Sequence, residues 1–442
     1  MPGPEVVPVH GDAALPPEVD VVVIGGGIIG TSTALELAES GLRVALCEKG
    51  VIAGEQSSRN WGWVRITRRD PREVPLMAEA LRMWSGMAER VGRDVGYTRA
   101  GIMFTCMTDR DFADHEGWVG NVAGRGLGTR MISGAEFAAM NPGGTMVPKG
   151  ALYTPEDGRA EPQKAAPAIA EAARARGAHL LTGCAVRGIE TAGGKVSGVV
   201  TERGAIRCGA VVLAGGAWSN LFAGNLGVDL PQLKVLNSVM RTAPLDGPEH
   251  TIWAMGFAIR KRQDGGYTIA SGHENVVNIV PKTFRYALPF LPALRHEWRS
   301  LKLRIGREFL DEARMATRWT LDGATPFEAC RVLDPEPNRA ILDRVLKNLR
   351  TAFPVFGQAQ VAQRWAGYID ATPDAVPVIS GVDAVPGFFI ATGLSGHGFG
   401  IGPAAGRLMA DLVTGAAPLV DPHDFRLSRF SDGSPIRLVT GF

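Results

Sequence analysis

The apolar and polar positions near the start of the chain predict a β–α–β unit. Residues Val21–Ile24 form a short β-branched run, typical of a buried strand, and a glycine-rich turn follows it. A helical period covers residues 28–40, and Gly41 stands where such a helix would end. Residues 43–48 are again predicted to form a strand. The preceding residues 1–18 are rich in Pro, Gly and Ala and show no period, so a flexible arm is expected there.

The same alternation of helix and strand returns twice later in the chain. It returns first with an Ala-rich helix that ends near Arg176 and a buried strand at residues 211–214. It returns again with a strand at residues 388–391 and a helix whose apolar side chains keep helical spacing up to Val413. The intervening sequence is richer in aromatic residues and Arg, and a helix is expected at residues 295–310.

Two interleaved domains follow from this pattern. A nucleotide-binding type of α/β domain is predicted at residues 19–96, 153–229 and 356–442. A second domain is predicted at residues 97–152 and 230–355, so the first domain is interrupted twice.

Composition and charge narrow the choice of partner. The chain has 442 residues, 45% hydrophobic and 21% charged, with a formal net charge of +2 and no long Lys or Arg run. This balance of charge excludes nucleic acid and an anionic membrane surface as binding partners, so a small-molecule ligand is expected. No apolar stretch is long enough for a membrane span and no signal peptide is visible, so a cytoplasmic protein is expected. Five scattered cysteines without a C-x-x-C pair predict neither a disulfide framework nor a metal site.

The turn after the first strand carries the strongest chemical signal. Gly25, Gly27 and Gly30 form a G-x-G-x-x-G motif between a strand and a helix. Gly25 permits the tight turn, Gly27 lets the backbone approach a pyrophosphate, and Gly30 lets the helix pack closely. The helix N-terminus favours phosphates, and Glu48, at the end of the next strand, can accept hydrogen bonds from a ribose diol. The motif predicts NAD or FAD, and the interrupted domain favours FAD.

Further segments carry a family resemblance: residues 57–62 (Ser-Ser-Arg-Asn-Trp-Gly), 211–219, 365–374 and 393–399 (Gly-Leu-Ser-Gly-His-Gly-Phe). Through them the chain resembles the D-amino-acid-oxidase superfamily of FAD enzymes, near its glycine oxidase and sarcosine oxidase branches. The resemblance implies a Rossmann-type FAD-binding domain of the glutathione-reductase type, interrupted by a substrate domain with an antiparallel sheet. It also implies that the protein oxidises a carbon–nitrogen bond with FAD.

By position, the resemblance assigns most cofactor contacts to these segments. Residues 57–61 would line the pyrophosphate and the flavin ring, Val186 would hold the adenine through its backbone, and residues 396–398 would lie against the flavin pyrimidine. Pro403 is expected to begin the final helix, so the loop before it would aim N–H groups at a ring that becomes anionic on reduction. The expected cofactor residues are Gly25, Gly27, Ile29, Gly30, Glu48, Lys49, Ser57, Ser58, Arg59, Asn60, Trp61, Val186, Ala214, Gly215, Trp218, Gly393, Ser395, Gly396, His397 and Gly398.

Several positions depart from the family pattern. Gly367 stands where sarcosine oxidases have a flavin-linked cysteine, so a non-covalent FAD is expected. Ile369 and Gly400 replace two cationic carboxylate anchors. The lysine that assists the reaction with oxygen in sarcosine oxidases aligns near Thr268 or Ile269 of this chain. The sequence therefore allows either oxygen or another molecule as the electron acceptor.

A substrate carboxylate then needs another cation, because a guanidinium orients a buried carboxylate through two parallel hydrogen bonds. Arg65 is the first choice, and Arg68 and Arg364 are the alternatives. Aromatic residues around it would favour an apolar or aromatic substrate side chain, and they are Trp61, Trp63, Trp365, Tyr368 and Phe399. The expected catalytic residues are His397, Arg65, Trp365 and Tyr368.

The resemblance implies oxidative deamination of an α-amino acid. Hydride transfer to flavin N5 would give an imine, which water hydrolyses to a keto acid and ammonia, so no acid or base is required. An N-alkyl amino acid or a 2-hydroxy acid is the alternative substrate, and a hydroxyl group would need a base such as His397. A flavin-binding subunit without its own turnover is a second class of function. A homo-oligomer is compatible with the sequence.

Overall fold

The apolar run Val21–Ile24 forms β1, a central strand of a six-stranded sheet in this computed structural model, which describes residues 3–439. All four residues of β1 are buried, as in a strand with both faces covered. Neighbouring strands pair in parallel, except for the antiparallel edge strand β21. In spatial order the strands are β21 (Val378–Gly381), β22 (Phe388–Thr392), β13 (Ala210–Leu213), β1, β2 (Val44–Cys47) and β9 (His179–Leu181).

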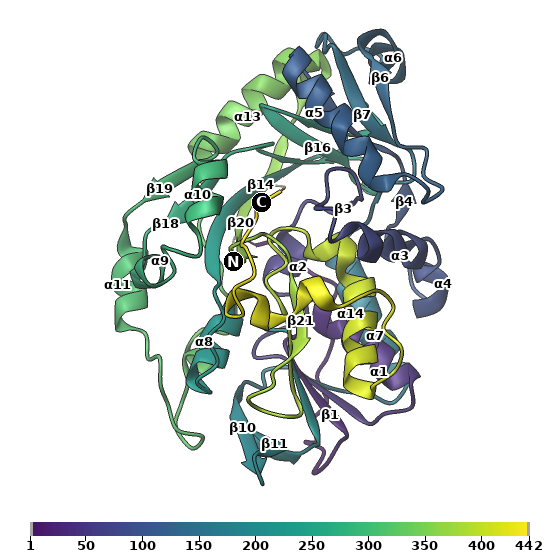
Figure 1. Cartoon of the computed structure of the whole chain (residues 1–442). Coiled ribbons are helices and arrows are strands. Elements are labelled where there is room, and N and C mark those ends of the chain that lie inside the picture. The colour runs from purple at the N-terminus through teal and green to yellow at the C-terminus, as the bar shows by residue number, and fades with distance from the viewer. Residues whose placement is uncertain (1–2, 440–442) are drawn as a thin grey trace.

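Both ends of the chain build this nucleotide domain. Helix α1 (Ile28–Glu39) packs against α7 (Pro162–Ala175) and against α14 (Gly398–Thr414). In Figure 1 the purple α1 and the yellow α14 therefore lie side by side in the lower part of the molecule. The predicted β–α–β unit is confirmed, and a separate antiparallel sheet follows β9, formed by β10 (Val186–Ala192), β11 (Lys195–Thr201) and β12 (Gly204–Arg207).

A larger sheet forms the upper part of the molecule in Figure 1. Most of its pairings are antiparallel, but β5 pairs in parallel with β15 and β18 with β19, so the expected antiparallel sheet is in fact mixed. In spatial order its strands are β19 (Leu301–Arg304), β18 (Asn275–Asn278), β14 (Leu233–Thr242), β17 (Tyr267–Ala270), β16 (Phe257–Lys261), β15 (Thr251–Ala254), β5 (Ile102–Cys106), β7 (Gly150–Thr154) and β6 (Arg130–Ser133).

The tenth strand of this sheet, β20 (Val361–Ala371), corrects a predicted domain boundary. It pairs along its length with β14, so the chain returns to the nucleotide sheet at β21 and not at residue 356. β20 ends, and the antiparallel β14 begins, beside the nucleotide domain, which places residues such as Tyr368 and Asp370 at the junction of the two domains. A further small sheet is formed by β3 (Trp63–Val64), β8 (Gly158–Arg159) and β4 (Thr98–Arg99), in which β8 pairs with both of the other strands.

Helices flank both sheets. Helix α13 (Arg339–Ala352) packs on β14, β16 and β17 through buried apolar residues at helical spacing, including Ile341, Val345 and Leu349. The other α-helices are α2 (Gln56–Arg59), α3 (Val74–Ser85), α4 (Met87–Val91), α5 (Asp109–Val119), α6 (Gly134–Met140), α8 (Ser219–Asn225), α9 (Pro281–Arg285), α10 (Leu291–Glu297), α11 (Arg307–Arg314) and α12 (Pro326–Ala329).

Two local predictions are wrong. The expected helix over residues 295–310 is divided by strand β19, because this segment pairs with β18 and Gly306 separates it from α11. The arm is not loose over residues 3–18, since backbone N–H groups of Val7 and Asp12 donate to carbonyls of Gln163 and Leu180 at 3.0 and 2.6 Å. Residues 1–2 of the arm lie outside the described residues.

Within residues 3–439, no helix combines the length and the apolar character that crossing a bilayer requires. The same part of the chain contains no group of three or more His, Cys, Asp or Glu side chains arranged to hold a metal ion.

Candidate active site

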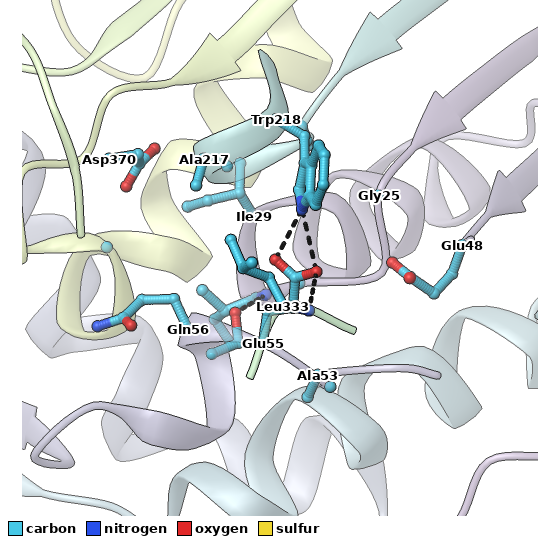
Figure 2. Close-up of a pocket in the computed structure, with 18 of the residues that line it drawn as sticks. Gly25, Ile29, Glu48, Ala53, Glu55, Gln56, Ala217, Trp218, Leu333 and Asp370 are labelled. Carbon is cyan, nitrogen blue, oxygen red and sulfur yellow. Dashed lines mark hydrogen bonds between the residues drawn. The ribbon is translucent and has the colours of Figure 1, made fainter. Parts of the chain in front are cut away.

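A cleft of about 1350 Å³ lies at the carboxyl ends of β1, β2 and β13. Ligands of open parallel α/β sheets bind at this edge. Figure 2 shows that Glu48 lies at one end of the cleft, whereas Gln56 and Asp370 lie at the other. The cleft is therefore elongated and runs from the nucleotide sheet to the junction with the large sheet.

The glycine loop makes the close approaches that its spacing predicts. Gly25 has φ +109°, and a Cβ there would lie 2.4 Å from the Ala214 carbonyl oxygen. A Cβ at Gly30 would lie 1.9 Å from the Gly25 oxygen, so only glycine lets α1 pack this closely on the loop. Gly27 precedes the first turn of α1, where the Ile28 N–H donates to Ser57 Oγ at 2.8 Å.

Glu48 directly follows β2 and is half-buried. Its Oε2 accepts the Gly26 N–H at 2.7 Å, and its Oε1 accepts the Gly50 N–H at 2.7 Å. Burial raises the pKa of Glu48, while the Lys49 charge and these two N–H groups act in the opposite direction. The backbone thus fixes the carboxyl group at the edge of the cleft, where a ribose diol could donate to it.

Most of the predicted cofactor residues line this cleft. Six of them do not: Trp61 and His397 line an adjoining cavity, Ser58 donates to the Glu55 carbonyl, Gly30 packs against the loop, and Gly393 and Ser395 shape the turn before α14. The predicted residues that line the cleft are Gly25, Gly27, Ile29, Glu48, Lys49, Ser57, Arg59, Asn60, Val186, Ala214, Gly215, Trp218, Tyr368, Gly396 and Gly398.

Glu55, which the sequence did not single out, organises one wall. The Trp218 Nε1–H donates to both of its carboxylate oxygens at 3.0 Å, and the Leu333 N–H donates to Oε1 at 3.0 Å (Figure 2). Lys49 Nζ lies 2.7 Å from the same carboxylate and donates to two backbone carbonyls. Lys49 and Arg59 are therefore engaged within the protein, the latter with Asp334 and the Ala366 carbonyl.

A second cavity, of about 680 Å³, adjoins the cleft. The two share Gln56, Asn60, Gly396 and Phe399 in their walls. Four predicted residues also line the second cavity, namely Trp61, Trp63, Arg65 and His397. Its remaining walls are contributed by Arg69, Asn237, Ser271, Gly272, Asn275, Ile369 and Gly400.

Arg65 and Arg69 both line this second cavity and form no ion pair among the described residues. Arg65 Nη1 donates to the Thr67 carbonyl, and its Cζ lies 5.2 Å from the Phe104 ring centroid. Arg69 is 2% exposed, its Nε donates to the Arg65 carbonyl at 3.1 Å, and its Nη1 is unpaired. Burial lowers the pKa of both groups, and the Arg69 charge lowers that of Arg65 further. Two guanidiniums that line a cavity and form no ion pair are suited to an anionic ligand.

The alternative arginines are engaged elsewhere. Arg68 pairs with Asp114 at 3.0 Å, and Arg364 pairs with Asp343 at 2.6 Å. Neither lines the second cavity. Arg69 was missed in the sequence, although it lies four residues after Arg65, because only the folded chain shows which guanidiniums lack a carboxylate partner.

Two predicted catalytic aromatics differ from expectation. Trp365 is fully buried behind Trp61, and its Nε1–H donates to the Arg59 carbonyl at 2.9 Å, so it lines neither cavity. Tyr368 lines the large cleft, and its hydroxyl accepts from Asn278 Nδ2 at 3.2 Å. Burial raises the pKa of Tyr368, so its hydroxyl keeps its proton.

His397 is the N-cap of α14, which begins at Gly398 and not at Pro403. Pro403 lies inside the helix, so the first helical N–H groups come from residues 398–400, nearer to the cleft than predicted. His397 is buried, with Nδ1 3.1 Å from Glu73 Oε2. Burial and the Arg69 charge lower the pKa of His397 to about 4.

Asp157 holds the segment that carries Arg65. It is fully buried, its Oδ1 accepts the Ile66 N–H at 2.6 Å, and its Oδ2 accepts from the Thr67 N–H and hydroxyl at 3.2 and 2.5 Å. Burial raises the pKa of Asp157 to about 6. This carboxyl group, which comes from a loop some ninety residues away, fixes the backbone directly after Arg65 and so helps to orient the Arg65 side chain.

Comparison with known proteins identifies the family. The family model described as FAD dependent oxidoreductase (DAO) matches residues 20–412. The chain belongs to this family. The solved structure of L-amino acid deaminase from Proteus myxofaciens in complex with anthranilate is similar to this chain at 38% identity, a TM-score of 0.93 and coverage of 97% of both chains.

Other relatives agree with this. L-amino acid deaminase from Proteus vulgaris is 34% identical, with a TM-score of 0.91 and coverage of 96% of this chain and all of its own. Glycine oxidase from Geobacillus kaustophilus is 27% identical over 427 residues, which cover 93% of this chain and 97% of that protein.

The cleft fits the FAD that the family implies. It is elongated and extends from the glycine loop to the second cavity, which suits a dinucleotide that ends in a flavin ring. Gly27 leaves room at the start of α1, because a Cβ there would already lie 3.0 Å from Ser57 Oγ. Gln56 Oε1, at the junction of the two cavities, is a buried acceptor without a donor, which an N–H group of the cofactor could satisfy.

Proposed function

We propose that the protein oxidises the carbon–nitrogen bond of an L-α-amino acid to an imine, which water converts to a keto acid and ammonia. The guanidiniums of Arg65 and Arg69, which line the second cavity and form no ion pair among the described residues, carry this proposal. They suit one carboxylate bound between them, as an α-amino acid requires. The two L-amino acid deaminases, at 38% and 34% identity, support the L configuration.

The family's cofactor supplies the redox chemistry, since a bound flavin can accept a hydride from the α-carbon. Glu48, Ser57 and the glycine loop would hold its dinucleotide part, and the first turn of α14 would lie toward its ring. Gly367 offers no thiol for a covalent link, so the FAD is proposed to be non-covalent.

Side chains of the second cavity supply position and exclude water. Arg65 and Arg69 would fix the carboxylate, which restricts the rotation of the α-carbon relative to the cleft. Trp61, Trp63 and Phe399 provide apolar walls, which support an apolar or aromatic substrate side chain.

An anaerobic screen tests the function directly. Purified protein would be mixed without oxygen with L- and D-amino acids, N-methyl amino acids and 2-hydroxy acids, while the flavin absorbance near 450 nm is followed. We expect apolar and aromatic L-amino acids to bleach the flavin fastest. Bleaching by 2-hydroxy acids alone would replace the proposed reaction, and no bleaching by any compound would favour a flavin-binding subunit without turnover.

Acid precipitation tests the cofactor linkage. The flavin is expected in the supernatant, whereas a yellow pellet would show a covalent bond to another residue. Because bleaching is followed before any electron acceptor is added, the result does not depend on whether oxygen or another acceptor completes the reaction.

A further inference from the structure

His397 and Glu73 form a buried pair that the proposed hydride transfer does not require. Glu73 is fully buried and His397 is 3% exposed, and each precedes the first turn of a helix, α3 and α14 respectively. Nδ1 of His397 lies 3.1 Å from Glu73 Oε2. The other ring nitrogen, Nε2, is buried without a hydrogen-bond partner, and His397 lines the second cavity with the two free guanidiniums.

The charges around His397 fix its protonation. Arg69 and Arg65 oppose a positive charge on the ring and Glu73 favours one, yet burial and the arginines dominate and lower the pKa of His397 to about 4. The imidazole is therefore neutral near pH 7. Its Nδ1–H donates to the Glu73 carboxylate, which leaves the lone pair on Nε2 as an unused acceptor.

We propose that Nε2 of His397 receives the α-amino proton of the amino acid that Arg65 and Arg69 hold, and that Glu73 is the positioning residue of this histidine. The inference rests on the proposed function. An N–H bond of the substrate ammonium breaks and an Nε2–H bond forms, so the substrate becomes a neutral amine and the imidazole an imidazolium. No electron is transferred in this step, and the Glu73 carboxylate stabilises the new positive charge.

The substrate itself would activate this base. In the empty cavity, the two guanidinium charges oppose protonation of His397. A carboxylate bound between Arg65 and Arg69 neutralises their field, so His397 becomes a stronger base only when the cavity holds an anion. Simple amines, which lack the carboxylate, would not be deprotonated. The arrangement therefore selects amino acids over amines at the proton-transfer step as well as at binding.

A pair of inhibitors isolates the amino contact from the carboxylate contact. Anthranilate, present in the structure of the Proteus myxofaciens relative, carries an amino group that benzoate lacks. Binding of each to the FAD-loaded protein would be followed through the flavin spectrum. His397→Ala should weaken anthranilate about threefold to tenfold, the value of one hydrogen bond, and leave benzoate unchanged. His250→Ala, at another half-buried histidine, should change neither.

These binding results separate the two proposals. Arg65→Met should weaken both ligands, and if it weakens neither, the carboxylate anchor of the proposed function is wrong. If His397→Ala binds anthranilate and benzoate as the parent does, the assignment of Nε2 is overturned whatever the arginine variant does. Unchanged benzoate binding also shows that the variant is folded and holds its flavin.

The pH dependence of anaerobic flavin reduction tests the proton transfer. At pH 7 the flavin of His397→Ala should be reduced by the amino acid at least about 100-fold more slowly than that of the parent, which is the usual contribution of a positioned base. The deficit should shrink above the pKa of the substrate amine, because water then supplies the neutral amine, and added imidazole should restore part of the rate at pH 7. Glu73→Gln should show a smaller deficit with the same trend. A deficit equal at every pH and insensitive to imidazole would show a structural role and overturn the proposal.

Discussion

The two adjoining cavities are built in opposite ways. The cofactor cleft is shaped by backbone: a glycine turn, the carboxyl ends of strands and helix N-termini, with its charged side chains Lys49 and Arg59 already paired within the protein. The second cavity is shaped by side chains, and its two guanidiniums, those of Arg65 and Arg69, form no ion pair among the described residues. Lys49 and Arg59 in the first are therefore balanced within the protein, whereas the second carries two cations that a ligand carboxylate could pair with.

This difference separates binding from selection. A backbone cradle recognises what all dinucleotides share, so it can be common to a whole family. Unpaired buried charges recognise one functional group in one place, and their number and position decide which substrate is oxidised. Substitutions in the cleft should therefore remove the flavin, while substitutions in the second cavity should leave a yellow protein with altered kinetics.

The largest effect is expected at the glycine loop. Gly30→Ala places a Cβ within 1.9 Å of a backbone oxygen, which cannot move aside as a side-chain end could, at a cost of about 3 kcal/mol. The purified variant should contain little flavin, measured as the ratio of 450 to 280 nm absorbance. Gly86→Ala is the control, because its Cβ meets no atom within 4 Å. If Gly30→Ala kept the flavin content of the parent, the claim that the backbone of the glycine loop shapes the cofactor cleft would be wrong.

Arg65 should show the next largest effect, on kinetics alone. Arg65→Met removes the contact proposed to the substrate carboxylate, which would be worth about 2 to 4 kcal/mol, or up to about a thousandfold in kcat/KM. Arg69→Met should act in the same direction, and Arg68→Met is the matched control, since Arg68 pairs with Asp114. Bound FAD should stay unchanged in all three. Full activity of both cavity variants at low substrate would mean that the carboxylate binds elsewhere.

Glu48 should affect only cofactor retention. Glu48→Ala removes a carboxylate that can accept charge-assisted hydrogen bonds from a ribose diol. The binding free energy of FAD should therefore weaken by about 1 to 3 kcal/mol, which raises its Kd roughly fivefold to 150-fold. Fluorescence titration of the apoprotein would measure this, with Glu39→Ala, at the far end of α1, as the control. With FAD at saturation, kcat/KM for the amino acid should match that of the parent. A large loss of kcat/KM would contradict the view that the cleft serves cofactor binding alone.

Asp157 should show the smallest effect. Asp157→Asn replaces one of two acceptor oxygens by a donor facing the Ile66 and Thr67 N–H groups, which loosens the segment that carries Arg65. A cost of about 1.4 kcal/mol in positioning predicts roughly tenfold lower kcat/KM with unchanged flavin content. Asp94→Asn, at an exposed carboxylate, serves for comparison. An unchanged kcat/KM would show that Arg65 does not depend on this support.

Local sequence was enough to predict the nucleotide half of the fold. The strand Val21–Ile24, the helix that follows and the strand expected at residues 43–48 all depend on neighbours within thirty residues, and the structure confirms them as β1, α1 and β2, the last over Val44–Cys47. The helix expected at residues 295–310 failed because pairing with β18, a tertiary contact, outweighed the helical pattern. The roles of the cofactor residues stay predictions, although most of them line the cleft.

The second cavity could not be predicted in the same way. Glu73 and His397 are 324 residues apart, and nothing in the local sequence of either indicates the other. The family motif brought His397 to attention but not its partner. Arg65, Arg68 and Arg69 lie together in one short run, and only burial and pairing in the folded chain distinguish the free guanidiniums from the paired one.

The packing of α1 against α14 has a consequence during protein synthesis. The first β–α–β unit leaves the ribosome early, but β22 and the first turn of α14, which complete the cleft, are made some 370 residues later. At 5 to 20 residues per second, translation from the start of α1 to the start of α14 takes roughly 20 to 75 seconds. Throughout that interval the nascent glycine loop has no opposite wall, so FAD can be captured only near the end of translation or after release.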